Sequence, residues 1–152
     1  MISVRVANRH SRERCPMTLI VRCVRMVLRG EGCREGEVSV VCISDGVSRR
    51  LNRRYLRHDY ATDVLCFPLG EGRIIEGEIY VNLDRARVQA RRYAVSRVHE
   101  LARLVVHGTL HLLGYDDRVT VQQQRMRRQE DRYLARLVRA SDRKEVHERP
   151  GC

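Results

Sequence analysis

Residues 96–117, SRVHELARLVVHGTLHLLGYDD, decide the fold of this chain because they predict one long helix that a core must enclose. Ser96 can cap this helix, and Gly114 stands where a helix end favours a left-handed residue. Most positions from 101 to 113 are apolar, so the helix is expected to be buried. At about 100° per residue, its polar residues form one stripe within about 40° of His107: Glu100, Arg103, His107 and His111.

Two histidines on this stripe form the first half of a candidate metal site. A buried polar group without a partner costs about 1–3 kcal/mol, and a shared metal ion would give both imidazoles a partner. His107 and His111 stand at i and i+4, a spacing at which two ring nitrogens can bind one Zn²⁺ at about 2.0–2.1 Å. Two ordinary histidines with other hydrogen-bond partners are the alternative for this pair taken alone.

The turn after the helix supplies a candidate third ligand. Gly114 lets the chain turn back, which brings Tyr115, Asp116 and Asp117 towards the two histidines. The carboxylate of Asp117 can bind zinc at about 2.0–2.2 Å, and three protein ligands leave a fourth position free, as in catalytic zinc sites. A polar turn that binds nothing is the alternative for Asp117.

The ligand spacing H-x3-H-x2-G-x2-D follows that of the metzincin proteases, with Asp117 in the place of their third His. Those enzymes need a Glu directly after the first His as general base, and this chain has Gly108 there. We therefore expect a zinc hydrolase that is not a peptidase.

Patterns in the rest of the chain predict the elements that surround this helix. Alternating or β-branched runs predict strands, and 3.6-residue periodicity with caps predicts helices. The expected strands are 2–8, 37–44, 63–69 and 78–83, and the expected helices are 17–28, 45–56, 84–93, 97–113 and 120–140. Asp84 is the expected cap of the helix at 84–93, and a turn is expected at 71–76. This order predicts an α/β fold of the α+β type, with a mixed four-stranded sheet surrounded by about five helices.

The 152 residues fit a single catalytic domain at 1–140, followed by a charged tail at 141–152 that we expect to be disordered. Thirty Lys and Arg against nineteen Asp and Glu give a formal charge of +11. Because Arg dominates this excess, a polyanion is the first partner to consider, although a genome that favours Arg codons would have the same effect. The chain has no C-x-x-C pair, no apolar membrane span and no signal-peptide core, so we expect a cytoplasmic protein without a membrane partner.

Two blocks of residues together resemble a known family. The first is His107-Gly-x-Leu-His111-Leu-x-Gly114-Tyr115-Asp116, and the second is Leu51-Asn52-x-x-Tyr55 followed by DYATDVLCFP at 59–68. Between them, Gly77-Glu78-Ile79 matches a G-[DE]-I strand. In this order the blocks are similar to the signature of the bacterial YbeY family of single-strand-specific endoribonucleases.

The resemblance implies a zinc ion held by three side chains, the first two being His107 and His111, beneath a positively charged cavity. It also implies cleavage of single-stranded RNA in the cytoplasm, including maturation of the 3′ end of small-subunit ribosomal RNA and ribosome quality control. Its partners would be single-stranded RNA and the ribosome, and the sequence gives no oligomeric state. The alternatives are a non-enzymatic ribosome assembly factor whose metal is structural, and a zinc hydrolase of another substrate.

The chain departs from the family pattern at two positions. The third ligand is usually a His, and here it is Asp117; an Arg often follows the Tyr of the second block, and here Leu56 follows Tyr55. We therefore assign the phosphate contact to Arg57 or to another Arg, Arg103 being the second candidate. This guanidinium would stabilise the charge that develops on the reacting phosphate. The alternative for Arg57 is a solvated arginine after a helix. Asp116 is expected to orient His107 or His111 or to line the site. Tyr115 is expected to line the site or to pack in the core.

Overall fold

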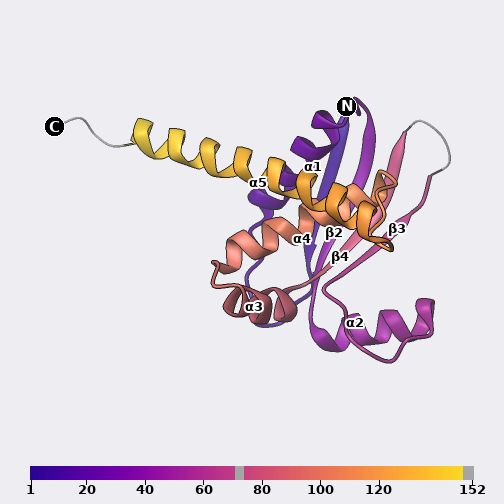
Figure 1. The fold of residues 1–152 in the computed structure, drawn as a ribbon. Helices are drawn as coiled ribbons and strands as arrows, with labels where there is room; N and C mark the ends of the chain where they lie inside the picture. The colour runs from indigo at the N-terminus through magenta and orange to yellow at the C-terminus, as the bar shows by residue number, and fades with distance from the viewer. Residues whose placement is uncertain (71–73, 149–152) are drawn as a thin grey trace.

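A mixed four-stranded sheet forms the centre of the computed structural model, which describes residues 1–70 and 74–148, with 139–148 described by their backbone alone. The strand order is β1-β2-β4-β3, with bounds β1 Ile2–Asn8, β2 Gly36–Ile43, β4 Ile75–Asn82 and β3 Val64–Pro68 (Figure 1). β1, β2 and β4 run parallel, and β3 is antiparallel to β4 at the edge of the sheet. The expected mixed sheet is thus confirmed.

In the described part of the chain, five α-helices pack beside the sheet: α1 Met17–Gly30, α2 Asp45–Leu51, α3 Leu83–Arg92, α4 Arg97–Leu112 and α5 Thr120–Glu148. α2 continues into the π-helical segment η1 (Asn52–Leu56). α4 is the central helix, since it contacts α1, α3 and α5 as well as β3 and β4. α5 packs on α1 and α4 and then extends away from the body (Figure 1).

Two glycines let α4 lie unusually close to the sheet. A Cβ at Gly108 would come within 2.8 Å of Ile79 Cγ2 and 3.1 Å of Val64 Cγ1. A Cβ at Gly77, on β4, would come within 2.6 Å of Leu112. Position 108 therefore faces the sheet, and any larger side chain there would displace the helix.

Several element bounds differ from those expected. β4 begins at Ile75 and not at residue 78, because its ladder with parallel β2 extends to the pair Gly36 and Ile75. α5 continues to Glu148, beyond the expected end near residue 140. Residues 75 and 76 of the expected turn at 71–76 lie in β4, and residues 71–73 lie outside the described part of the chain. Residues 141–148 of the expected tail continue α5, and residues 149–152 lie outside the described part, so disorder stays a prediction for them alone.

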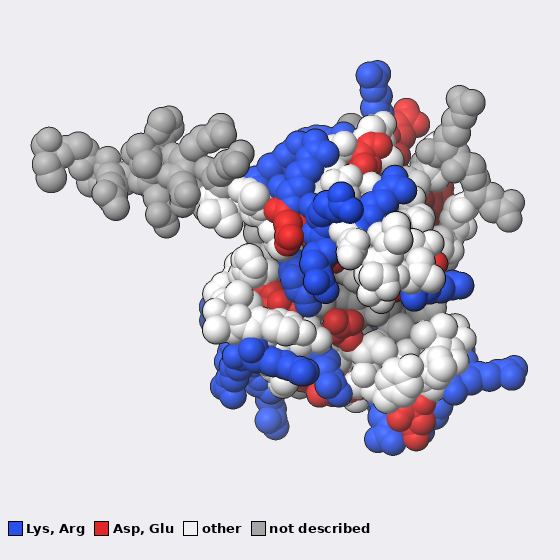
Figure 2. All heavy atoms as spheres, in the orientation of Figure 1, with Lys and Arg blue, Asp and Glu red and all other residues white. Residues whose placement is uncertain are grey.

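Basic side chains are spread over the face that α5 crosses, among uncharged and fewer acidic side chains (Figure 2). The exposed arginines of α5 contribute to this surface: Arg125, Arg127, Arg128, Arg132 and Arg136. Within the described residues, the helices are all too short or too polar to cross a lipid bilayer.

Candidate metal centre

The polar stripe of α4 is present as the sequence predicts. Ser96 caps the helix by accepting a hydrogen bond from the backbone N–H of His99 at 3.0 Å. At the same end of the stripe, the buried carboxylate of Glu100 accepts a hydrogen bond from Arg103, with 3.1 Å between Nε and Oε2. His107 and His111 follow one and two turns further along the helix.

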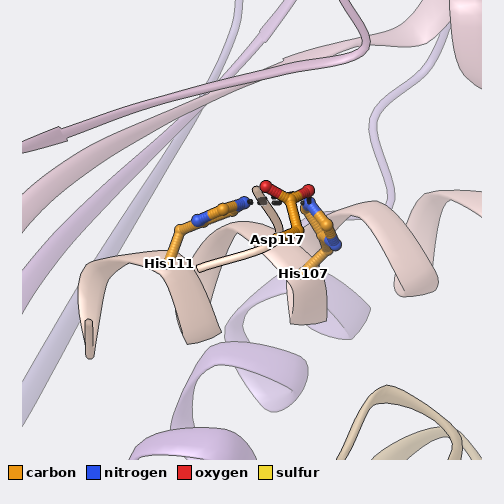
Figure 3. A group of neighbouring side chains, drawn as sticks. All are labelled: His107, His111 and Asp117. Carbon is orange, nitrogen blue, oxygen red and sulfur yellow. Dashed lines mark hydrogen bonds and ion pairs between the residues drawn. The ribbon is translucent and has the colours of Figure 1, made fainter. Parts of the chain in front are cut away.

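The end of α4 turns the chain back as expected. Gly114 has φ of +94°, and its N–H donates to the carbonyl of His111 at 3.0 Å. The N–H of Tyr115 donates to the carbonyl of Leu110 at 3.1 Å, so the two bonds form a Schellman motif. This turn returns the chain towards the helix and places Asp117 over the two histidines (Figure 3).

Three side-chain atoms converge at this point: His107 Nε2, His111 Nε2 and Asp117 Oδ2. The two nitrogens lie 3.0 Å apart, and the oxygen lies 3.7 Å from the first and 3.8 Å from the second. Tetrahedral ligands with bonds of about 2.0–2.1 Å lie about 3.3 Å from one another, so the triangle has the size that zinc requires. His107, His111 and Asp117 are 23%, 28% and 45% exposed, which leaves the site accessible to water and to a substrate.

Glu130 on α5 contacts the candidate site, although the sequence patterns above did not include it. Its buried carboxylate accepts a hydrogen bond from Nδ1 of His107. Burial opposes protonation of His107, but the bond and charge of Glu130, together with Asp117 and Asp63, raise the pKa of His107 above its usual value. Because Nδ1 carries the proton towards Glu130, the lone pair of Nε2 points at the metal position.

The signal for Glu130 was available in the sequence. The residue lies on the apolar stripe of α5 and interrupts it with a charge; that stripe is Met126, Glu130, Tyr133, Leu134 and Leu137. A carboxylate on the buried side of an otherwise apolar stripe needs a partner, as the histidines of α4 do. The sequence could not say which partner it has.

Asp116 does not have the orienting role that we considered for it. Its Oδ1 accepts from the backbone N–H of Asp117 at 2.7 Å and of Arg118 at 3.3 Å, and its Oδ2 lies 3.2 Å from Nε of Arg118. The carboxylate next to His107 is that of Glu130 instead. Asp116 shapes the turn that carries Asp117, because an Asp side chain readily bonds the backbone just after itself.

Tyr115 joins the turn to α5 and to the end of α1. Its hydroxyl donates to Glu31 Oε1 at 3.0 Å and accepts from Gln129 Nε2 at 3.1 Å. Its ring is partly buried against the core, and the guanidinium of Arg125 lies 5.5 Å from the ring centroid. The packing interpretation of Tyr115 therefore fits the structure, and the residue anchors the turn that carries Asp117.

Arg57 lies at the C-terminal end of η1, exposed and with a positive φ of 57°. Among the described side chains it has no hydrogen bond or ion pair with His107, His111 or Asp117. Its assigned contact with phosphate therefore stays a prediction.

The polar residues around Arg57 serve the local structure. Asn52 is buried, and its Nδ2 donates to the Tyr60 carbonyl at 2.8 Å and to Thr62 Oγ1 at 3.2 Å. Ser48 Oγ donates to the Thr62 carbonyl and accepts from the Thr62 N–H, both at 3.0 Å. These bonds fix the loop between η1 and β3.

Position 108 cannot hold the general base of a metzincin protease. A side chain there would enter the contact between α4 and the sheet, where Ile79 and Val64 already pack. A side-chain base at position 108 is thus excluded by the packing of α4 on the sheet.

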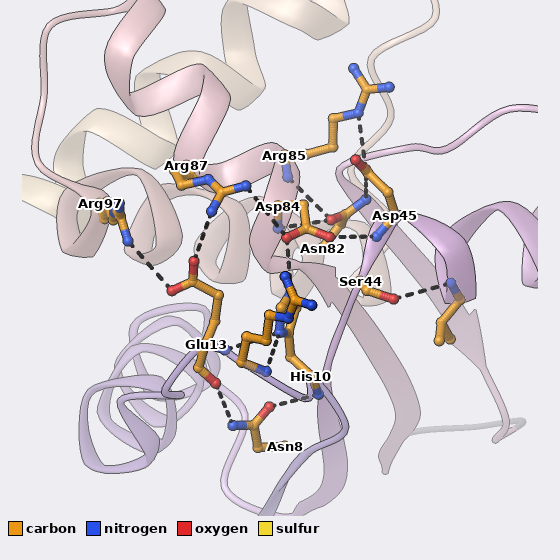
Figure 4. Close-up of polar contacts among 12 residues, drawn as sticks. Asn8, His10, Glu13, Ser44, Asp45, Asn82, Asp84, Arg85, Arg87 and Arg97 are labelled. Atoms are coloured by element: carbon orange, nitrogen blue, oxygen red, sulfur yellow. Dashed lines mark hydrogen bonds and ion pairs between the residues drawn. The ribbon is translucent and has the colours of Figure 1, made fainter.

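A second polar cluster lies where β4 meets α3 (Figure 4). Asn82 caps α3, because its Oδ1 accepts from the backbone N–H groups of Asp84 at 3.0 Å and Arg85 at 3.1 Å. The expectation that Asp84 is the cap was wrong. The helix begins at Leu83, directly after β4, so Asp84 already lies in its first turn.

Asp84 instead binds the segment that follows β1. It accepts from His10 Nε2 at 2.8 Å and from the backbone N–H of Asp45 at 2.9 Å (Figure 4). Nδ1 of His10 accepts from the backbone N–H groups of Arg12 and Glu13, so both ring nitrogens are used in holding this loop. Burial opposes ionisation of Asp84, but the Asp45 N–H and His10 outweigh it and lower the pKa of Asp84.

Comparison with known proteins shows similarity over nearly the whole chain. A sequence model described as endoribonuclease YbeY matches residues 4–138, a range that includes the metal centre and Glu130. A protein of Chlorobium luteolum named endoribonuclease YbeY is 41% identical over 129 residues, covering 85% of this chain and 94% of its own. A protein of Chloroherpeton thalassium with the same name is 37% identical over 132 residues, covering 87% and 94%. The solution structure of a Thermotoga maritima protein is similar with a TM-score of 0.65 at 25% identity, covering 98% of this chain and 99% of that one.

Proposed function

Because this chain belongs to the endoribonuclease YbeY family, as its motifs suggested, we propose that it cleaves single-stranded RNA with one zinc ion bound by His107, His111 and Asp117. The proposed substrate is ribosomal RNA, at the 3′ end of the small-subunit RNA, in the cytoplasm, with a further part in ribosome quality control. The proposed partners are this RNA and the ribosome that contains it.

The observation that carries the metal proposal is the triangle of two imidazole nitrogens and one carboxylate oxygen, with sides of 3.0, 3.7 and 3.8 Å. Glu130 supports it, because a carboxylate that accepts the Nδ1 proton fixes the tautomer in which Nε2 is a ligand. Bound zinc would lower the pKa of a water molecule and polarise a phosphoryl oxygen, which is the chemistry that phosphodiester hydrolysis needs.

The other residues of the site hold this arrangement in place. Gly114 and Tyr115 fix the turn that presents Asp117, through the end of α4 and through Glu31 and Gln129. Arg57 is proposed to contact the reacting phosphate, since a guanidinium offers two donors to phosphate oxygens.

The charge distribution supports a nucleic-acid substrate. The formal charge is +11, and Figure 2 shows basic side chains on the face crossed by α5. A protein that neutralises several phosphates releases counterions, so its affinity for RNA should fall steeply as salt rises.

The metal proposal is tested by metal analysis of protein purified without chelator. We expect about one zinc per chain in the wild type and less in His111→Ala, with both proteins folded. Equally low metal content in the two proteins would refute the site.

The activity is tested with a single-stranded RNA and a duplex of the same composition. We expect cleavage of the single strand only, loss of cleavage after chelation, and recovery when a divalent metal is added back. Cleavage that persists both after chelation and in His107→Ala would come from a contaminating nuclease. RNA binding without any metal-dependent cleavage would leave a ribosome assembly factor in place of an enzyme.

The ribosomal substrate is tested in cells that lack the protein. We expect small-subunit RNA with an unprocessed 3′ end, which the wild-type gene corrects and His111→Ala does not. Correct 3′ ends in such cells would refute this substrate without affecting the proposed nuclease chemistry.

A further inference from the structure

An exposed basic and aromatic segment follows α2 and projects beyond the ends of the strands (Figure 1). We call this segment, residues 53–60 (RRYLRHDY), the arm; every one of its residues is exposed. Tyr55, Leu56 and Tyr60 are 55%, 46% and 54% exposed. Single exposed apolar residues are common, but two tyrosine rings and three arginines within eight residues form a patch of defined chemistry.

The arm is held in one conformation despite its exposure. Asn52, at its base, is buried and bonds the Tyr60 carbonyl and Thr62, and its own carbonyl accepts from the His58 N–H at 3.2 Å. The carboxylate of Asp59 accepts from Arg49 Nε at 2.9 Å and from Arg53 Nη2 at 2.6 Å. A preformed surface loses less conformational entropy when it binds a ligand.

The aromatic surface continues from the arm onto the sheet. The Tyr55 ring packs edge-to-face on Phe67, with centroids 5.6 Å apart, and Phe67 packs edge-to-face on Tyr80 at 5.7 Å. Ile79 and Cys66 contact α4, so Phe67 and Tyr80, which alternate with them along β3 and β4, lie on the opposite face of the sheet. Tyr55, Phe67 and Tyr80 therefore form one aromatic cluster on the face that α4 leaves uncovered.

Two arginines give this cluster a positive charge. The guanidinium of Arg54 lies 5.4 Å from the centroid of the Tyr55 ring, and Arg57 is exposed two residues further on. In the part of the chain that the structure describes, neither Arg54 nor Arg57 forms an ion pair with a carboxylate. Both are thus available to phosphate groups, whereas Arg53 is already paired with Asp59.

The edge strand connects the cluster to the metal centre. β3 is the outermost strand of the sheet, and Cys66, the residue before Phe67, donates its thiol proton to the carbonyl of Gly108 at 3.4 Å. Gly108 directly follows His107. A strand of RNA that lies on the aromatic cluster can therefore pass around a single edge strand to approach the metal centre.

We propose that Tyr55, supported by Phe67 and flanked by Arg54 and Arg57, is a stacking site for an unpaired base of single-stranded RNA. This inference rests on the proposed function and adds a physical basis for strand selectivity. An aromatic ring stacks on any base whose face is free, and the bases of a duplex have no free face. Arg54 binds a phosphate next to the stacked base, and Arg57 keeps its proposed contact with the reacting phosphate, so neither contributes a sequence preference.

The test uses fluorescence, because the chain contains no tryptophan. Tyr55→Trp gives a full-length protein with a single tryptophan at the proposed site. Tyr93→Trp is the matched control, since Tyr93 is also 55% exposed and has an arginine, Arg103, over its ring. With chelator present to prevent cleavage, a short single-stranded RNA should quench the fluorescence of Tyr55→Trp saturably, and a duplex should not. Quenching of both variants to the same extent would overturn the stacking site.

A binding series separates stacking from packing. Tyr55→Phe should keep wild-type affinity for single-stranded RNA, whereas Tyr55→Leu, which keeps an apolar contact for Phe67 but has no aromatic face, should bind at least about fivefold more weakly. Equal affinity of Tyr55→Leu and the wild type would overturn the inference and leave the nuclease proposal intact. Failure of the wild type to bind single-stranded RNA at all would overturn both.

Discussion

Replacement of Glu130 by Gln should weaken zinc binding although Glu130 does not contact the metal position. The buried carboxylate accepts the Nδ1 proton of His107, and Nε2 of the same ring faces His111 and Asp117. The amide of Gln can still accept this proton, so the ring should keep its orientation. The lost charge makes the imidazole a poorer ligand, because a carboxylate partner increases the basicity of the ring.

The expected magnitude follows from the two roles of Glu130. Removal of a partner of this kind costs about 10- to 100-fold in metal affinity, or about 1.4–2.7 kcal/mol. Glu130→Gln keeps the orientation and should lie near about tenfold, whereas Glu130→Leu removes both orientation and charge and should lie near about 100-fold.

Competition with a chromophoric chelator at neutral pH measures the zinc affinity directly. Asp131→Asn is the matched control, since Asp131 is the next residue of α5, loses the same charge and is exposed. Circular dichroism of the metal-free proteins shows whether each variant is folded. If Glu130→Gln and Asp131→Asn bind zinc equally tightly, the carboxylate of Glu130 has no influence on the metal, and the proposed role is wrong.

Three further predictions use other parts of the structure. Asp117→Ala should lower the zinc affinity by at least about tenfold, whereas Asp117→His should retain zinc; the same chelator titration measures both. Equal zinc affinity of Asp117→Ala and the wild type would show that Asp117 is not a ligand and belongs only to the turn. Gly108→Ala should lower the free energy of unfolding, measured in urea, by about 1–2 kcal/mol, because the cost of overpacking against Ile79 is larger than the gain in helix propensity. Gly46→Ala is the control and should not destabilise the protein, because its Cβ would meet nothing closer than 3.9 Å. The pKa of Asp84 is lowered in the folded state, so the ionised carboxylate stabilises the protein above about pH 4, and this contribution is lost as the pH falls through the folded-state pKa. Between neutral pH and about pH 3, Asp84→Asn should therefore lose less free energy of unfolding than the wild type, as measured by urea titrations.

The sequence alone determined the features that depend on neighbours along the chain. His107 and His111 lie on one side of a helix because residues four apart are about 40° apart in any α-helix, whatever packs around it. Gly114 ends that helix in the left-handed conformation because a residue without a Cβ adopts it at little cost, and the turn then brings Asp117 back to the histidines. The order of strands and helices was likewise readable, since each element has its own periodicity.

Only the tertiary structure decided the contacts between residues far apart in sequence. Glu130 reaches His107 because α5 packs on α4, and the charged residue on the stripe of α5 did not by itself identify its partner. Asp84 looked like a helix cap, yet its carboxylate binds His10, which lies 74 residues earlier in the chain, while Asn82 caps α3. In both cases local sequence offers a side chain several partners of similar free energy. The packing of distant elements selects one of these partners, because only this packing determines which partner lies within hydrogen-bond distance and which one is solvated instead.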